Sequence, residues 1–258
     1  MSVSKPRIAW VTGASRGIGH AVALELAREG WTVAASARSV ADIEALAAAC
    51  AEFPGAVQPY PLDITGENAA RKTVCEIENR LGPIDLAVLN AGTHEPVDGR
   101  AISVAPFRRL MEINYMGTVN CLAPVAERFV ARRAGRIAVV ASLAGYRGLP
   151  TASAYGASKA ALINMCEALR PELRAAGVLL SVVTPGFVRT PLTDRNPFPM
   201  PFLIDADTAA RRIVRGLATS RFEITFPRRF SYLMKLLRVL PHMLYFSVTR
   251  RAVPKSET

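Results

Sequence analysis

The sequence predicts an α/β fold in which helices cover both faces of a doubly wound parallel sheet. Short apolar runs rich in β-branched residues alternate along the chain with longer segments of helical spacing. Several of these helical segments end at a glycine, which is typical of helix C-termini. The chain has 258 residues, of which 50% are hydrophobic and 21% are charged, and this fits one globular domain better than two.

Strand and helix segments follow one another in strict alternation, as in a parallel sheet built from strand–helix–strand units. Most of the strand segments are apolar at successive positions, so we expect them to be buried on both faces. The expected strands are Ile8–Thr12, Trp31–Ser36, Ile84–Asn90, Arg136–Ser142, Leu179–Thr184 and Phe222–Phe226. The expected helices are Gly19–Glu29, Val40–Cys50, Glu67–Leu81, Pro106–Arg132, Ala154–Ala176 and Asp207–Thr219.

A glycine-rich turn, Thr12-Gly-Ala-Ser-Arg-Gly-Ile-Gly19, joins the first strand to the first helix. Backbone N–H groups at such a helix N-terminus can bind a pyrophosphate, so the turn predicts a dinucleotide site. The same residues also match the G-x-S-x-G turn of α/β-hydrolases. A hydrolase needs several strands before this turn, and only twelve residues precede Gly13. The dinucleotide interpretation is therefore favoured.

A second motif, Tyr155-Gly-Ala-Ser-Lys159, lies on an expected helix. Residues four apart share one helix face, so the Tyr155 phenol and the Lys159 ammonium can point into one pocket. A cation beside a phenol stabilises the phenolate and lowers its pKa. The pair therefore predicts a tyrosine that works as an acid or base.

Further short motifs complete a pattern that resembles the short-chain dehydrogenase/reductase family. They match the family in order and spacing over about residues 6–226, and the Rossmann-type fold and the hydride chemistry follow from the resemblance, whereas the substrate does not. The motifs are Thr12-Gly-x3-Gly-x-Gly19, Asn90-Ala-Gly92, Asn114, Ser142, Tyr155-x3-Lys159 and Pro185-Gly186.

The resemblance implies four catalytic residues: Asn114, Ser142, Tyr155 and Lys159. Tyr155 would be the general acid/base at the substrate oxygen, and Ser142 would donate a hydrogen bond to that oxygen. Lys159 would hold the ribose hydroxyls of the nicotinamide nucleotide and lower the pKa of Tyr155. Asn114 would support a water relay to Lys159. A non-catalytic relative has no need for all four, which favours an enzyme.

The cofactor is expected to be NADP(H). An NAD enzyme usually carries an acid at the end of the second strand, and this chain has Ala37 followed by Arg38. Arg16 in the glycine turn and Arg38 could converge on a 2′-phosphate. The full set of expected cofactor contacts is Gly13, Ser15, Arg16, Gly17, Ile18, Gly19, Arg38, Asp63, Asn90, Ala91, Gly92, Tyr155, Lys159, Pro185, Gly186, Val188 and Thr190.

The segment from Thr190 to Phe202 is rich in proline and follows the last cofactor motif, where the family covers its substrate. Phe198, Met200, Phe202 and Leu203 suggest a small apolar substrate. A proline-stiffened loop anchored by its own aromatic residues is an equally good interpretation.

The four cysteines are widely spaced and form no Cys-x-x-Cys pair, which predicts neither a metal site nor a disulfide framework. The N-terminus carries no apolar signal region, and no uncharged apolar run reaches about 18 residues. We therefore expect a cytoplasmic protein, and the resemblance implies a homodimer or homotetramer.

Basic residues gather in the C-terminal tail. Residues 221–258 contain eight lysines and arginines and two glutamates, and so supply +6 of the net charge of +11. Their apolar residues lie mostly at helical spacing, with Pro241 as a break. The apolar residues mostly at this spacing are Phe230, Leu233, Leu236, Leu237, Leu240 and Leu244. Two short amphipathic segments could pack on the catalytic domain, contact a second subunit or lie peripherally on an anionic membrane. No nucleic-acid recognition motif accompanies the charge, so we expect no nucleic-acid partner.

Taken together, the sequence predicts a catalytic domain over residues 1–227 and a basic apolar extension over residues 228–258. The expected activity is hydride transfer between NADP(H) and the carbonyl or secondary alcohol of a small apolar substrate. The alternative is a regulatory or interaction protein that binds NADP(H) on the same fold without turnover.

Overall fold

The computed structural model describes residues 6–193 and 200–250 of the chain. Its centre is one sheet of seven parallel strands in the order β3-β2-β1-β4-β5-β6-β7. The prediction of a doubly wound parallel α/β fold is confirmed. The strands are β1 (Ile8–Thr12), β2 (Thr32–Ser36), β3 (Ala56–Pro59), β4 (Leu86–Leu89), β5 (Arg136–Val140), β6 (Leu179–Pro185) and β7 (Glu223–Phe226).

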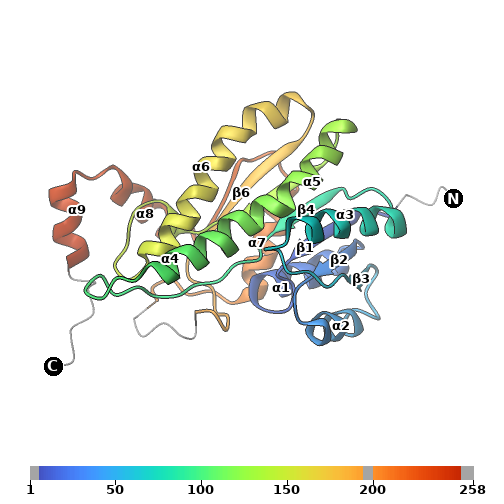
Figure 1. Ribbon diagram of the computed structural model, residues 1–258, viewed down its shortest axis with the longest axis horizontal. Helices are drawn as coiled ribbons and strands as arrows, with labels where there is room; N and C mark the ends of the chain where they lie inside the picture. Colours follow the sequence, from blue (N-terminus) through green and yellow to red (C-terminus); the bar gives the residue numbers. More distant parts are fainter. Residues whose placement is uncertain (1–5, 194–199, 251–258) are drawn as a thin grey trace.

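Helices cover both faces of this sheet (Figure 1), and each layer has its own apolar core. One core lies under α3 (Glu67–Leu81), α5 (Gly117–Ala131) and α6 (Ser153–Ala175). The other lies under α1 (Gly17–Arg28), α2 (Val40–Ala49) and α7 (Ala206–Leu217). The central strands contribute side chains to both cores, which explains why their sequences are apolar at most successive positions.

The expected helix over Pro106–Arg132 is found, but it is not one regular α-helix. The chain instead forms α4 (Val104–Leu110), a π-helical turn η1 (Met111–Met116) and then α5. The Thr118 hydroxyl donates to the backbone oxygen of Asn114 at 2.7 Å, so this carbonyl bonds a side chain as the wider turn gives way to α5. Such π-turns inside helices occur often at functional sites.

Strand β3 was not expected from the sequence. It is a four-residue edge strand with one buried side chain, and it ends in proline. A strand of this kind has neither the apolar run nor the alternation that reveals a strand, and an edge position tolerates its proline.

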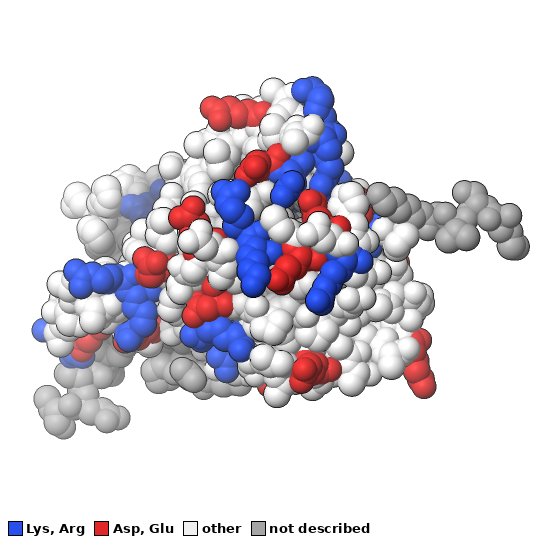
Figure 2. All heavy atoms as spheres, turned by 45° about the vertical axis from the view of Figure 1, so that its right-hand side comes forward, with Lys and Arg blue, Asp and Glu red and all other residues white. Residues whose placement is uncertain are grey.

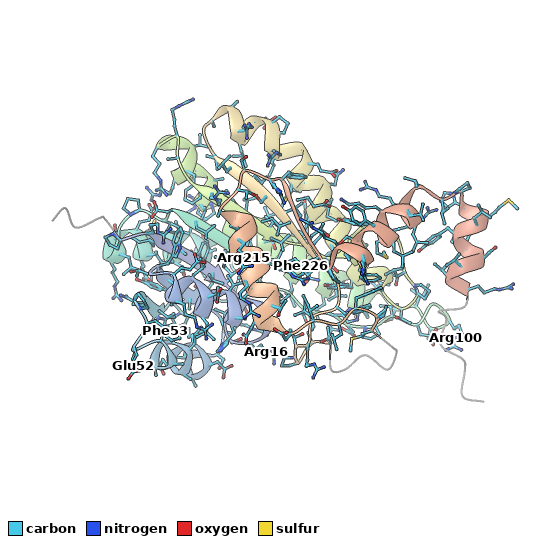
Figure 3. The ribbon with its side chains drawn as sticks, turned by 180° about the vertical axis from the view of Figure 1, so that it is seen from behind. Arg16, Glu52, Phe53, Arg100, Arg215 and Phe226 are labelled. Atoms are coloured by element: carbon cyan, nitrogen blue, oxygen red, sulfur yellow. The ribbon has the colours of Figure 1, made fainter. Side chains whose placement is uncertain are left out.

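The chain ends in α8 (Arg228–Val239) and α9 (His242–Thr249), which lie where the sequence predicts two short helical segments separated by Pro241. Both project from the end of the molecule opposite α2 (Figure 1; Figure 3 shows the same from behind, with Glu52 and Phe53 marking the α2 end). In the part of the chain that is described, no helix is long and apolar enough to cross a membrane.

Candidate active site

A cleft of about 500 Å³ opens where β1, β2, β4, β5 and β6 end. These carboxyl ends meet at one edge of a parallel sheet, and ligands of such folds bind there. Of the expected site residues, the cleft is lined by Gly13, Ser15, Arg16, Gly17, Ile18, Arg38, Asp63, Asn90, Ala91, Gly92, Ser142, Tyr155, Lys159, Pro185, Gly186, Val188 and Thr190. Gly19 and Asn114 do not reach its wall and support it from behind.

The glycine turn passes very close to the end of β4. A Cβ atom on Gly13 would lie 2.7 Å from the Ala91 Cα, and one on Gly19 would lie 2.3 Å from the Gly13 carbonyl oxygen. Gly13 also has a φ of 67°, which favours glycine. The two glycines are therefore needed for the turn to close, whatever it binds.

Side chains also fasten this turn to β4. The Asn90 amide donates to the Thr12 carbonyl at 3.1 Å, and the Thr12 hydroxyl accepts the backbone N–H groups of Asn90 and Ala91. Helix α1 begins at Gly17 with no side-chain cap and no acidic residue in its first turn. Its N-terminal N–H groups therefore face the cleft in a field that favours an anion.

Arg16 and Arg38 both line the cleft and are exposed to solvent. Figure 3 shows Arg16 at the sheet edge where α1 begins. Asp63 lies close to Arg38: hydrogen bonds from the Thr65 backbone and hydroxyl lower the pKa of the Asp63 carboxyl, and the Arg38 guanidinium lowers it further. The neighbouring carboxylate neutralises part of the positive charge of Arg38.

Tyr155 lies in the first turn of α6 and is partly buried. Burial raises the pKa of the Tyr155 phenol, and a hydrogen bond with the Ser142 side chain opposes that rise. Ser142 follows β5 and accepts the Ala144 N–H at 3.2 Å, which fixes its position at the start of a 3₁₀ turn. The expected lowering of the Tyr155 pKa by Lys159 stays a prediction, because burial is the largest influence on this phenol.

Lys159 is buried one turn along α6, with its Nζ 5.8 Å from the centre of the Tyr155 ring. It donates to the Val140 carbonyl at 2.8 Å. Burial lowers the pKa of the Lys159 ammonium to about 8. An ammonium has three donors, so a side chain held by one strand-end carbonyl can still donate to hydroxyls in the cleft.

Asn114 occupies the π-turn η1 and is completely buried. Its side-chain oxygen accepts the Thr93 N–H at 2.7 Å, and its amide donates to the Thr93 carbonyl and to the Ser158 hydroxyl. A Cβ atom on Gly92 would lie 3.1 Å from the Asn114 Oδ1 and 3.4 Å from the Lys159 Nζ. The glycine therefore leaves room between the two side chains.

Three polar residues near the cleft were missed at the sequence level. Glu95 and Arg109 form an ion pair that lines it. The His94 ring meets the Tyr155 ring edge-on, with 4.7 Å between ring centres, and burial lowers the pKa of its imidazole. His94 and Glu95 follow β4, and their only signal in the sequence is their position just after Asn90-Ala-Gly92. Arg109 lies on α4 outside any motif.

The segment expected to cover the substrate reaches the cleft wall with Pro191 and Leu192, but not with its described apolar residues further along. Phe202 instead stacks on Phe230 of α8, with 6.1 Å between the ring centres. Phe187 also stacks on Phe230, with 5.6 Å between the ring centres. Met200 and Leu203 do not line the cleft either, and Phe198 lies outside the described residues. The aromatic anchoring of this segment agrees with its second interpretation.

These features fit a dinucleotide phosphate. The two close-packed glycines, the uncapped start of α1 and the buried Lys159 all point to one elongated polar ligand along the strand ends. Among the residues that the structure describes, no group of three or more His, Cys, Asp and Glu side chains could hold a metal ion.

Comparisons with known proteins agree with this geometry. The family model described as short chain dehydrogenase matches residues 7–197. An uncharacterised oxidoreductase of Myxococcus xanthus is 36% identical over 245 residues, which are 95% of this chain and 97% of the relative. The 3-oxoacyl-(acyl-carrier-protein) reductase FabG of Thermotoga maritima is 31% identical and covers 74% of this chain and 78% of its own length. A short-chain dehydrogenase of Sphingobium yanoikuyae, solved with NADPH, has a TM-score of 0.78 at 25% identity, covering 92% of this chain and 97% of that one.

Proposed function

The chain belongs to the short-chain dehydrogenase/reductase family of oxidoreductases, and we propose that it transfers a hydride between NADP(H) and a carbonyl or secondary alcohol. The observation that carries the proposal is the convergence of Tyr155, Ser142 and Lys159 on one cleft beside the glycine turn. When bound, the nicotinamide cofactor would supply or accept the hydride.

In this proposal Tyr155 moves the proton. Its phenol donates to the substrate oxygen during reduction and accepts the proton during oxidation. A phenol whose pKa is raised by burial stays protonated at neutral pH and is ready to donate. Ser142, which shares a hydrogen bond with Tyr155, holds the same oxygen and fixes its distance from the phenol.

Lys159 positions the cofactor in this proposal. The carbonyl of Val140 aims its ammonium into the cleft, where it would hold ribose hydroxyls. Hydrogen bonds to these hydroxyls would replace part of the water that Lys159 loses on burial, and so favour its charged form. The charged ammonium would in turn lower the pKa of the Tyr155 phenol. Asn114 keeps the space beside Gly92 open for a water between itself and Lys159.

The choice of NADP(H) over NAD(H) is supported by Arg16 and Arg38 at the cleft and by the apolar Ala37 between β2 and Arg38. A guanidinium–phosphate contact is charge-assisted, whereas a free ribose hydroxyl gains little from it. A structural relative with 25% identity was solved with NADPH, which agrees with this choice.

We further propose that the substrate is small and largely apolar, because Pro185, Val188, Pro191 and Leu192 form one wall of the cleft. The Glu95–Arg109 ion pair contributes a polar patch to the same cleft. We propose a cytoplasmic homodimer or homotetramer, with a catalytic unit over residues 1–227 and peripheral membrane contact through the extension that follows it.

The test is a screen of NADPH oxidation over ketones and aldehydes of increasing chain length, with the reverse reaction followed on secondary alcohols. We expect turnover on at least one apolar carbonyl compound, and turnover lower by roughly 10³-fold to 10⁴-fold in the Tyr155→Phe variant. A protein that binds NADPH tightly and turns over no member of either panel would instead be a non-catalytic NADP(H)-binding protein.

A further inference from the structure

Helix α8 carries two apolar faces on opposite sides. Phe230, Met234 and Leu237 repeat at i, i+4 and i+7 and pack towards the domain. Tyr232, Leu236 and Val239 repeat at the same spacing two residues later, where side chains point the opposite way, and they are exposed by 69%, 57% and 74%. An ordinary surface helix presents polar residues on its outer side. The outer face of α8 is instead apolar, and no other part of the described chain covers it.

Helix α9 continues this exposed apolar surface. Only Tyr245 is buried, whereas Met243, Leu244, Phe246 and Val248 are exposed, Met243 by 84%. We define the C-terminal surface as the exposed apolar side chains of α8 and α9. Scattered apolar residues on a protein surface need no explanation, but a concentration of this kind marks a contact site.

The C-terminal surface is held firmly against the domain. The Arg147 guanidinium donates to the carbonyls of Leu237, Arg238 and Leu240 at the end of α8, and it stacks 4.0 Å from the centre of the Tyr245 ring. The Tyr245 hydroxyl donates to the Gly148 carbonyl. Exposure of the outer side chains is therefore a property of the docked helices, because their inner side chains are already in place.

The charges around the C-terminal surface have one sign. Residues 228–250 contain five lysines and arginines and no aspartate or glutamate. Within the described part of the chain, only Lys235 among them makes an ion pair, with Glu223. The layer formed by α3 and α5 is different: Arg71 pairs with Glu127 and Arg132 with Glu78, and Figure 2 shows basic and acidic side chains interspersed over the middle of the face drawn.

Charge also separates the candidate partners. A symmetric contact between two copies through this surface would bring together charges of one sign, because four of the five cations have no ion pair within the described chain, and such a contact is unfavourable. An anionic bilayer offers negative headgroups to the arginines and an apolar layer to the exposed side chains. Arg228, Arg229 and Lys235 flank the exposed stripe of α8 in the manner of a helix that lies in the membrane interface.

We propose that the C-terminal surface binds anionic phospholipid membranes, with α8 and α9 lying in the headgroup region and the catalytic domain outside it. This rests on the peripheral membrane contact of the proposed function and makes it specific: the lipid is anionic, and an apolar substrate would concentrate in the same layer. The α8 end is close to the cleft, because a Cβ atom on Gly186, which lines the cleft, would lie 2.8 Å from the Phe230 ring. A membrane bound at this surface would thus lie near the site.

The test is flotation of the full-length protein with vesicles of phosphatidylcholine containing phosphatidylglycerol, and with vesicles of phosphatidylcholine alone, at low salt. We expect binding to the anionic vesicles and weakening as salt rises. Val239→Glu and Met243→Glu should each weaken the vesicle affinity roughly tenfold, since each removes apolar contact and adds a negative charge. Val40→Glu on α2 is the matched control, because this valine is 44% exposed at the opposite end of the molecule.

Three results would overturn the proposal. One is a full-length protein that stays with the soluble fraction beside anionic vesicles at low salt. A second is equal vesicle binding by Val239→Glu and Val40→Glu. A third is an oligomer, seen by sedimentation without vesicles, that Val239→Glu dissociates and Val40→Glu leaves intact, because a second copy would then occupy the surface. Flotation needs no turnover, so its failure is independent of a failed assay on water-soluble ketones.

Discussion

The cleft and the C-terminal helices adjoin each other at Gly186 and Phe230, yet they treat polar and apolar groups in opposite ways. At the cleft, the buried Lys159 and Asn114 are hydrogen-bonded, and the Asn114 side chain, behind the cleft wall, makes three bonds to Thr93 and Ser158. On α8 and α9, apolar side chains such as Val239 and Met243 face solvent. A buried polar group without a hydrogen-bond partner costs free energy, and a concentrated apolar surface in water does so too. Each region is therefore suited to a partner.

The difference shows two ways in which a chain can prepare for a ligand. The cleft fixes single groups: Val140 aims Lys159, and Thr12 holds the turn to β4. The C-terminal surface fixes no single group and offers area and charge. A cleft of the first kind discriminates between ligands atom by atom, whereas a surface of the second kind suits a partner without a fixed shape, such as a lipid layer.

The largest expected effect of a single substitution lies in the cleft. Tyr155→Phe removes the proton donor, and we expect kcat to fall by roughly 10³-fold to 10⁴-fold while the dissociation constant of NADPH stays within about twofold. The measurement is steady-state turnover on a carbonyl substrate together with NADPH fluorescence titration. Tyr245→Phe is the matched control, because its hydroxyl bonds to Gly148 outside the cleft. Near-normal kcat in Tyr155→Phe would refute the acid–base role.

The next effect separates the inner and outer faces of the C-terminal helices. Phe230 is 8% exposed and stacks with Phe187 and Phe202, so Phe230→Ala should lower the free energy of unfolding by about 3–4 kcal/mol. Phe246→Ala, on the exposed side of α9, should cost less than about 0.5 kcal/mol. Urea denaturation measures both. Equal costs would show that the two faces do not differ in packing as described.

A third effect concerns a buried charge, which the cleft has and the C-terminal surface lacks. Burial lowers the pKa of Lys159 to about 8, below its ordinary value of 10.5, so the folded state releases the proton first. The burial penalty is complete below pH 8 and disappears as pH rises from about 8 to about 10.5. Relative to Lys159→Met, the cofactor-free wild type should therefore gain up to about 3 kcal/mol of unfolding free energy across this window.

The measurement is urea denaturation of both proteins at about pH 7 and about pH 10. Tyrosines whose pKa is raised, such as Tyr146, shift stability with the opposite sign at high pH, but they are present in both proteins and cancel in the difference. Lys72→Met, on the exposed side of α3, controls for the loss of a lysine. A constant difference between wild type and Lys159→Met over the whole range would contradict the buried-charge argument.

The sequence predicts the elements whose physics is local. Six strands and the glycine turn are evident because apolar runs and close backbone packing leave a direct trace in the residues. Edge strand β3 leaves no such trace, since a single buried side chain suffices to hold it. The π-turn at Met111–Met116 is also hidden, because the partner of Asn114 is Thr93, distant in sequence and brought close only by the fold.

The site divides in the same way. The residues of the cleft that belong to motifs were foreseen, and the structure brings them together. The Glu95–Arg109 pair and the contact of His94 with Tyr155 were missed because the loop after β4 meets α4 and α6 only in three dimensions. For the tail, spacing predicted two helices but not which apolar residues face inwards. Arg147 helps to fix the orientation by binding the end of α8, and no local pattern marks this arginine.

The smallest expected effect tests whether the cations of the cleft differ from those of the C-terminal surface. A cation that meets one fixed phosphate should change the choice between two soluble ligands, whereas a cation beside a lipid layer should not. Arg38→Ala is therefore expected to reduce the ratio of NADH to NADPH dissociation constants by roughly tenfold. This is the low end for a charge-assisted contact, because Asp63 already neutralises part of the Arg38 charge.

Arg38→Ala should leave vesicle flotation unchanged. Arg238→Ala should weaken vesicle flotation and leave the ratio of NADH to NADPH dissociation constants unchanged. Arg215→Ala, on α7 and outside the cleft wall, controls for the loss of an arginine (Figure 3). Equal affinity of the wild type for NADPH and NADH would refute the assignment, and an Arg38→Ala variant that lost vesicle binding as well would show that the two sets of cations act as one field.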